Sequence, residues 1–234
     1  MLRKLRILIV EDEIAIRTGL IDVFVYHGYE VDFSGHGAEG LNKALTGKFD
    51  LILLDVMLPG MNGFEVCNRI REKNRDQAII MLTAKSSDED IIEGLSLGAD
   101  DYIAKPFSVV QLILRVQAVL RRTRNGMTQN QTIKLGGELV VDCQNLSGKH
   151  RGENLSFTRR EIEILQYLQS HSERPVSREE LLGKVWGYAN HLHIETRTVD
   201  IHIAKLRRKI EADAAEPEFL ITVRGAGYRL IGQT

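Results

Sequence analysis

The chain has 234 residues, of which 43% are hydrophobic and 27% charged, and its formal net charge at pH 7 is −1. This composition excludes a wholly disordered chain and a strongly basic protein, so a nucleic-acid partner would have to meet positive charge concentrated on one surface. No apolar run approaches the ~18 residues that a membrane-spanning helix needs, and the two cysteines, Cys67 and Cys143, lie far apart. We therefore expect a cytoplasmic protein with reduced thiols.

The first half of the chain alternates short β-rich runs with helix-like stretches. The expected strands are 5–10, 29–33, 51–54, 78–82 and 102–104, and the expected helices are 14–27, 38–47, 63–73, 88–97 and 108–122. Continuous apolar strands that alternate with helices are typical of a parallel sheet covered on both faces. Five such units predict a doubly wound α/β domain over residues 1–122, and the polar stretch 123–131 that follows predicts a flexible linker.

Residues 132–234 have a different pattern and predict a second domain. Short strands are expected first, then three helices, of which the third covers roughly 196–211, and finally a hairpin over 219–230. Two of the helices begin with the spacing of a capping box, in which a hydroxyl accepts an orphan amide hydrogen bond and a glutamate reaches back. These pairs are Thr158 with Glu161, and Ser177 with Glu180.

Polar side chains follow four of the five expected strands of the first domain. They are Glu11 and Asp12 after the first strand, Asp55 after the third, Thr83 after the fourth and Lys105 after the fifth. Carboxyl ends of strands are where open α/β sheets bind ligands. Three carboxylates at one rim are tolerable if a hard cation lies among them, and Mg²⁺ prefers such oxygen ligands. A lysine and a hydroxyl at the same rim suit a phosphoryl group, which one of the carboxylates could accept as an acyl phosphate.

At this point the chain resembles the receiver domain of two-component response regulators. The matching text is ILIVEDE (7–13), DLILLDVMLPGMNGFEV (50–66), IIMLTAK (79–85) and GADDYIAKPF (98–107). The resemblance implies a flavodoxin-like (CheY-like) fold with five parallel strands. It also implies that a sensor histidine kinase phosphorylates Asp55, that Ala84 leaves access to that residue, and that the Lys105–Pro106 bond is cis.

The resemblance further implies a role for each residue at the rim. The roles are Asp55 as phosphoacceptor; Glu11, Asp12, Asp55 and the backbone carbonyl of Met57 as ligands of Mg²⁺; Thr83 and Tyr102 as switch residues; and Lys105 as the cation that pairs with the phosphate.

In the resembling subfamily, the fourth helix, fifth strand and fifth helix form the face through which phosphorylated receivers dimerise. Candidates for this face are Asp100, Asp101, Arg115 and Arg122. Many relatives pair a basic residue in the fourth helix with a glutamate in the fifth, and those positions are Ile91 and Gln111 here, so one expected salt bridge is absent. The alternative for Asp101 and Arg115 is a solvated surface pair that contributes little to stability.

The third helix of the second domain has two distinct faces. Val199, Ile203, Leu206 and Ile210 form an apolar stripe that predicts a face packed on a core. The opposite side is basic and contains Ile201, which we expect to be exposed. On a helix lying in a major groove, this side chain could touch a thymine methyl group or a sugar.

Three helices followed by a hairpin form the winged helix-turn-helix arrangement. TRTVDIHIAKLRRKIE (196–211), ITVRGAGYRLI (221–231) and the four-stranded stretch at 132–157 resemble the effector domain of the OmpR/PhoB subfamily. The resemblance implies contacts with promoter DNA, and that the loop 186–194 meets RNA polymerase. The DNA contacts would be phosphate contacts from Arg197, Thr198, His202, Arg207, Thr222 and Tyr228, with Trp186 as a further candidate; base readout by Asp200 and Lys205; and a minor-groove contact from Arg224.

These expectations describe a DNA-binding regulator that dimerises on phosphorylation and catalyses only its own phosphorylation and dephosphorylation. Two other functions stay open. A phosphohydrolase would use Asp55 as nucleophile, but such enzymes commonly carry a second aspartate two residues on, where this chain has Met57. The second open function is a regulator that responds to partners without phosphate. The complete set of acidic, hydroxyl and lysine residues at the rim argues against it.

Overall fold

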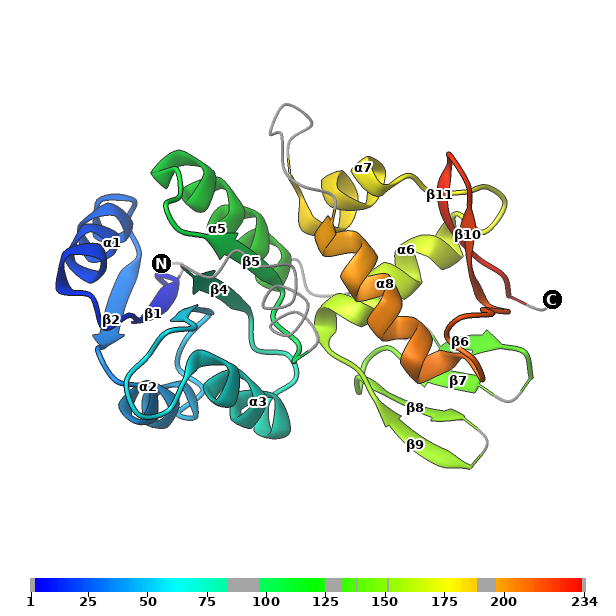
Figure 1. The fold of residues 1–234 in the computed structure, drawn as a ribbon, viewed down its shortest axis with the longest axis horizontal. Helices are drawn as coiled ribbons and strands as arrows, with labels where there is room; N and C mark the ends of the chain where they lie inside the picture. The colour runs from blue at the N-terminus through cyan, green and yellow to red at the C-terminus, as the bar shows by residue number, and fades with distance from the viewer. Residues whose placement is uncertain are drawn as a thin grey trace. The chain divides into compact units, whose positions relative to one another are not determined.

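The computed structural model describes residues 3–83, 97–124, 132–137, 139–150, 152–188 and 197–232, without the side chains of 122–124. The chain divides into two compact units, Met1–Arg124 and Asn125–Thr234 (Figure 1). The boundary follows Arg124 because the last helix of the first unit continues to that residue, two positions beyond the expected end of the domain. No helix in the described ranges is both long and apolar enough to cross a membrane.

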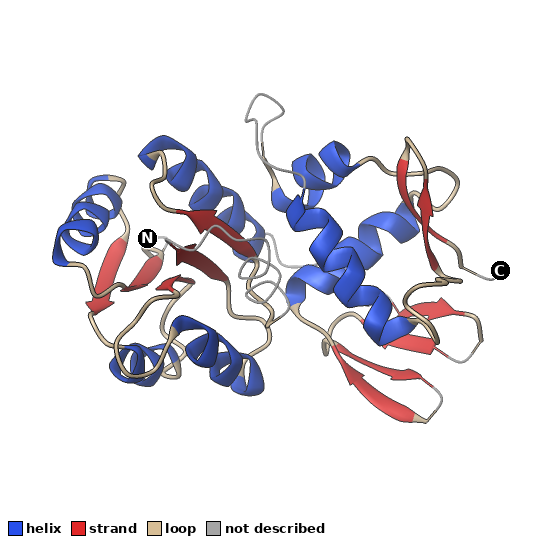
Figure 2. Cartoon of the chain, viewed as in Figure 1, coloured by secondary structure: helices blue, strands red, loops and turns tan. Residues whose placement is uncertain are grey.

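The first unit is a parallel sheet of five strands in the order β2-β1-β3-β4-β5. Helices α1 and α5 cover one face of this sheet, and α2 and α3 cover the other (Figure 2). Its elements are β1 (Arg6–Val10), α1 (Ile14–Tyr26), β2 (Glu30–Ser34), α2 (Gly37–Ala44), β3 (Leu51–Asp55), α3 (Gly63–Lys73), β4 (Ile79–Thr83), β5 (Asp101–Ala104) and α5 (Val109–Arg124). The predicted doubly wound fold is therefore confirmed, and the expected helix at 88–97 lies mostly outside the described residues.

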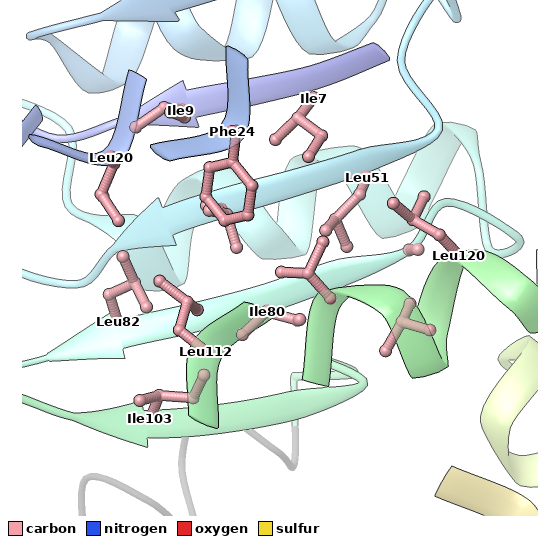
Figure 3. Packing of buried hydrophobic residues seen from close by; sticks show 14 residues of the cluster. Ile7, Ile9, Leu20, Phe24, Leu51, Ile80, Leu82, Ile103, Leu112 and Leu120 are labelled. Carbon is pink, nitrogen blue, oxygen red and sulfur yellow. The ribbon is translucent and has the colours of Figure 1, made fainter. Parts of the chain in front are cut away.

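The apolar runs of the sequence form the core of this sheet. All five residues of β3 and of β4 are buried, as expected for central strands covered on both faces. Figure 3 shows the α1 and α5 side of this core, where Phe24 of α1 and Leu112 of α5 lie against side chains of the strands. Truncation of a buried phenylalanine such as Phe24 typically costs about 3–5 kcal/mol.

Helix α2 ends at Ala44, three residues before the expected end. The Thr46 hydroxyl donates a hydrogen bond to the Lys43 carbonyl at 2.7 Å, which satisfies one of the last carbonyls of the helix. Gly47, three residues after the end of the helix, adopts a φ of +68° without steric cost, and its amide donates to the Ala44 carbonyl at 3.2 Å.

The second unit has the predicted winged-helix arrangement. An antiparallel sheet in the order β6-β7-β8-β9 precedes three helical segments and a β10-β11 hairpin, the wing. Its elements are β6 (Thr132–Leu135), β7 (Leu139–Asp142), β8 (Ser147–His150), β9 (Glu153–Ser156), α6 (Arg159–Ser170), α7 (Arg178–Leu181), which continues as a π-helical turn (Leu182–Trp186), α8 (Arg197–Ile210), β10 (Leu220–Val223) and β11 (Gly227–Leu230).

The two predicted caps differ. Thr158 and Glu161 form a reciprocal capping box at the start of α6, as expected. Ser177 caps α7 by accepting a hydrogen bond from the Glu180 amide, but the Glu180 carboxylate binds Arg174 and the Tyr167 hydroxyl instead of reaching back. A guanidinium is a stronger partner for a carboxylate than a backbone amide, so the second box is incomplete.

Candidate functional site

Three carboxylates meet at the carboxyl ends of β1 and β3. Glu11 and Asp55 are buried, Asp12 is exposed, and one oxygen from each lies within 4.8 Å of the others. Gly63 allows α3 to begin beside this site, because a Cβ at that position would overlap the Asp55 carbonyl oxygen. The parallel topology has thus brought together residues separated by more than forty positions.

Lys105 lies between two of these carboxylates. Its Nζ is 2.8 Å from Asp55 Oδ2 and 2.8 Å from Glu11 Oε2. Burial by itself lowers the pKa of Lys105, but hydrogen bonds to Asp55 and Glu11 outweigh it, so the pKa is raised above its ordinary value. The ammonium group is therefore a fixed positive charge at the rim.

Glu11 is fully buried, and burial raises its pKa to about 7. The neighbouring Asp55 charge adds to this rise, whereas Lys105 opposes it. One lysine therefore does not fully compensate two adjacent buried carboxylates, which is the electrostatic situation that a divalent cation relieves. Oxygen donors of this kind and number fit Mg²⁺, with water completing its coordination.

The other predicted residues of this site also lie near the rim. Thr83 is fully buried at the end of β4, and its carbonyl accepts a hydrogen bond from the Lys105 amide at 2.6 Å. Tyr102 is 6% exposed on β5, and the Lys105–Pro106 bond is cis. The Met57 amide donates to Asp55 Oδ1 at 3.2 Å. Ala84, like Ile91 of the predicted dimer face, lies outside the described residues.

The candidates for a dimer face are arranged differently from the expectation. Asp100 is 2% exposed and binds the Arg71 guanidinium at 3.1 Å and the Ile79 amide at 2.9 Å, so it belongs to the interior. Asp101 and Arg115 form an ion pair of 2.7 Å within one chain, and Asp101 is fully buried, which excludes the solvated surface pair. The side chain of Arg122 is outside the described residues.

Helix α8 buries its apolar stripe as predicted. Val199, Ile203, Leu206 and Ile210 are at most 1% exposed. Ile201, expected on the exposed face, is only 8% exposed, so the prediction of an exposed side chain was wrong. Sequence periodicity gives the angular position of a residue on its helix, but it does not show which other segments of the chain cover that position.

His202 is also buried, although the resemblance implied a phosphate contact. Its ring is 2% exposed, its Nδ1 lies 3.0 Å from the Thr198 carbonyl, and it packs edge-on against Trp186 with ring centroids 5.2 Å apart. Burial lowers the pKa of His202 to about 4. The ring is therefore neutral at pH 7 and part of the core, as is Trp186, which also packs against the Arg160 guanidinium, 4.5 Å from its ring centroid.

Lys205 was expected to read bases, yet its ammonium is paired internally. Its Nζ lies 3.1 Å from Glu161 Oε1, and Lys209 Nζ lies 2.6 Å from Glu161 Oε2. Glu161 is fully buried, which would raise its pKa, but the two lysine charges outweigh burial and lower it. In this structure the Lys205 ammonium is therefore bound within the domain, and base readout by Lys205 stays a prediction.

Asp200 connects α8, the third helix of the winged-helix arrangement and from here on the recognition helix, to the wing. Its Oδ1 accepts hydrogen bonds from the Tyr228 hydroxyl at 2.5 Å and from Arg178 Nε at 2.6 Å. Burial, followed by the contact with Asp200, raises the pKa of Tyr228 to about 12. Asp200 was expected to read bases; in this structure its Oδ1 accepts both donors, while 42% of its side chain is exposed, so this stays a prediction.

Most of the remaining candidates for DNA contact are accessible. Arg197, Thr222 and Arg224 are exposed, and Arg224 lies in the turn of the wing. Arg207 donates to Thr222 Oγ1 at 2.8 Å and to the Leu220 carbonyl at 2.8 Å, so the recognition helix and the wing share one cationic edge. Thr198 is less accessible, with 8% of its surface exposed.

Comparison with known proteins decides the family. The model of the response regulator receiver domain matches residues 7–117, and that of the C-terminal domain of transcriptional regulatory proteins matches residues 152–230. A probable transcriptional regulatory protein of a Picosynechococcus strain is 41% identical, over 97% of this chain and 92% of its own length. The chain belongs to the response regulators of the OmpR/PhoB type.

Other relatives and solved structures agree with this assignment. The probable transcriptional regulator ycf27 of Cyanophora paradoxa is 40% identical over 97% of this chain and 96% of its own length. The structure of a RitR mutant has a TM-score of 0.76 and 29% identity, and covers 98% of this chain and 100% of that one. DrrB of Thermotoga maritima, an OmpR/PhoB homologue, has a TM-score of 0.52 and 30% identity, with coverage of 98% and 100%.

Four residues of the two domains have roles that the sequence did not indicate. In the receiver, Arg71 holds Asp100, and Arg17 binds the loop that carries Glu11 and Asp12. In the effector, Glu161 binds the lysines of the recognition helix, and Arg178 binds Asp200. Only Glu161 had a sequence signal, its capping-box position, and that signal accounts for only one of its contacts.

Proposed function

We propose that this response regulator binds promoter DNA as a dimer when Asp55 is phosphorylated by a sensor histidine kinase. The observation that carries this proposal is the rim itself. Asp55 lies within 4.8 Å of two further carboxylates and 2.8 Å from the Lys105 ammonium, and it ends a buried strand at the ligand-binding edge of the sheet.

In the proposed reaction, an Asp55 carboxylate oxygen attacks the phosphorus of a phosphohistidine. An oxygen–phosphorus bond forms while the phosphorus–nitrogen bond of the donor breaks. Mg²⁺, held by Glu11, Asp12, Asp55 and the carbonyl of Met57, would supply charge neutralisation for the developing acyl phosphate. Lys105 would exchange its contact with Asp55 for one with a phosphoryl oxygen, since an ammonium on a flexible stem can reposition.

The new group adds close to two negative charges at a buried rim. Thr83 ends β4 at this rim, and its carbonyl is hydrogen-bonded to the Lys105 amide, so a movement of either residue would be transmitted to the other. Tyr102 would respond with them. A receiver that populates two conformations would then shift toward the one that dimerises, through the face that includes β5 and α5.

Dimerisation would raise affinity for paired DNA sites through effective concentration, without any new DNA contact. We assign phosphate contacts to Arg197, Arg207 and Thr222, and the minor-groove contact to Arg224. The receiver would catalyse only its own phosphorylation and dephosphorylation. RNA polymerase would meet the loop 186–194, most of which lies outside the described residues.

The test is the intact mass of the full chain after incubation with acetyl phosphate, with and without Mg²⁺, beside the Asp55→Asn variant. We expect one Mg²⁺-dependent phosphoryl adduct that is absent in the variant. An adduct of the same size on Asp55→Asn would assign the chemistry to another residue. No adduct on either protein would favour a regulator that works without phosphate.

A further inference from the structure

Arg17 of α1 reaches back to the loop that carries two of the proposed Mg²⁺ ligands. Its Nη1 donates to the Glu11 carbonyl at 2.7 Å and to the Asp12 carbonyl at 3.1 Å. The same loop is bound a second time, because the Glu13 amide lies 3.4 Å from Glu11 Oε1. The guanidinium is therefore bound to the backbone of both acidic residues.

The surroundings of Arg17 hold its guanidinium in this position. Its Cζ lies 5.6 Å from the ring centroid of Phe33, an aromatic residue of β2 that is 47% exposed. A cation over an aromatic face is attracted to it electrostatically. Gly35 is also close, since a Cβ there would lie 3.2 Å from Arg17 Nη1. Phe33 thus provides a platform, and Gly35 provides the room that the guanidinium needs.

We propose that Arg17 is a positioning residue for the metal site: it fixes the backbone of Glu11 and Asp12 so that their carboxylates converge with Asp55. This inference rests on the proposed Mg²⁺ site. Two adjacent carbonyls that point to one guanidinium restrict the rotation of the peptide groups on either side of Asp12. Because Asp12 is exposed, packing alone does not hold its side chain toward Asp55.

The direction in which removal of Arg17 changes the Mg²⁺ affinity distinguishes a positioning role from simple electrostatics. Arg17 is a positive charge near a cation site, so by Coulomb's law alone its removal would strengthen Mg²⁺ binding. A positioning role predicts the opposite, since loss of groups that orient metal ligands typically weakens metal affinity by about 10–100-fold.

Lys43 is a matched control for the charge. Its Nζ lies 5.8 Å from the same Phe33 ring, but in the described part of the chain its partners are Asp32, Glu39 and the Phe33 carbonyl, and not the acidic loop. The Lys43→Gln variant therefore removes an equal charge beside the same platform and leaves the acidic loop bound.

The experiment is calorimetric titration of the full chain with MgCl₂ for the wild type and for Arg17→Gln, Arg17→Lys and Lys43→Gln. We expect the dissociation constant to rise about tenfold for Arg17→Gln, to rise less for Arg17→Lys, which keeps one donor group, and to stay unchanged or fall for Lys43→Gln. Unchanged or tighter binding by a folded Arg17→Gln protein would overturn the proposal.

If Arg17→Gln does not fold, Gly35→Ala takes its place, because the added methyl group would lie 3.2 Å from Arg17 Nη1 and requires the guanidinium to shift without removing it. It should weaken Mg²⁺ binding, and an unchanged affinity would count against the role of Arg17. Absence of Mg²⁺ binding by the wild type would instead contradict the proposed function. The two failures are therefore distinguishable.

Discussion

Lys205 of the recognition helix and Glu161 of helix α6 form an ion pair, with Nζ 3.1 Å from Oε1. Glu161 is fully buried; as the third residue of α6 it completes the capping box with Thr158, and it is also the partner of Lys209. One carboxylate therefore holds the start of α6 and two positions of α8. Lys205 therefore serves as a structural cation in the described effector domain.

We expect Lys205→Ala to destabilise the effector domain while leaving its sequence preference unchanged. The loss should be about 1–2 kcal/mol, less than for a fully unpaired charge, because Lys209 and the Thr158 amide still bind Glu161. Urea unfolding followed through Trp186, the one tryptophan of the chain, measures this loss. A selection of binding sites from random DNA measures the preference, and a relaxed preference in a stable variant would restore Lys205 as a base-reading residue.

Because of His202, we expect the effector domain to lose folding stability as the pH falls. Its pKa is lowered to about 4 by burial, with Arg160 and Lys205 acting in the same direction and Glu161 against them. A lowered pKa means that the contribution to stability is complete above the unfolded value of about 6.5 and is lost as the pH falls toward 4. Between pH 6.5 and 5 we expect a loss of about 1.5 kcal/mol.

The matched variant for this loss is His202→Phe, which keeps an aromatic ring against Trp186 and does not titrate. The free energy of unfolding of this variant should not fall between pH 6.5 and 5 as that of the wild type does, even if the variant is more or less stable than the wild type overall. Glu180, whose pKa is lowered to about 2, titrates only below this window in both proteins. Equal slopes for the wild type and the variant would show that another group causes the acid sensitivity.

Arg207 is expected to bind the DNA backbone without reading sequence. It lies between the recognition helix and the wing and donates to Thr222. Arg207→Ala should weaken binding to all DNA sequences alike and reduce the slope of log affinity against log salt by about one. Lys149→Ala on β8, in the separate four-stranded sheet, removes an equal charge and should leave the slope unchanged. A loss confined to one DNA sequence would indicate base readout.

We expect substitution of Arg71 to destabilise the receiver more than substitution of its partner Asp100. Arg71→Met removes the cation that pairs with a buried carboxylate, to which the Ile79 amide also donates, and such a loss typically costs about 3–5 kcal/mol. Asp100→Asn keeps an oxygen that accepts from both groups and should cost less. Thermal unfolding of the two variants compares them, and a milder effect for Arg71→Met than for Asp100→Asn would contradict this assignment.

The sequence by itself determined the order and type of nearly every described element. Apolar runs such as 51–54 and 78–82 predict covered strands, and polar residues at the carboxyl ends of parallel strands share one edge of the sheet. Strand direction alone places Glu11, Asp55 and Lys105 at this edge. The apolar stripe of α8 was equally readable from its spacing.

Only the tertiary structure decided which charged side chains serve the interior and which face outward. Asp100, His202 and Lys205 lie at positions where sequence pattern allows either, and each is held by a partner on another element: Arg71 on α3, Trp186 at the end of the π-helical turn, and Glu161 on α6. An ion pair depends on distances of a few ångströms between segments remote in sequence. Helical and strand periodicity describe single elements, so they carry no information about such distances.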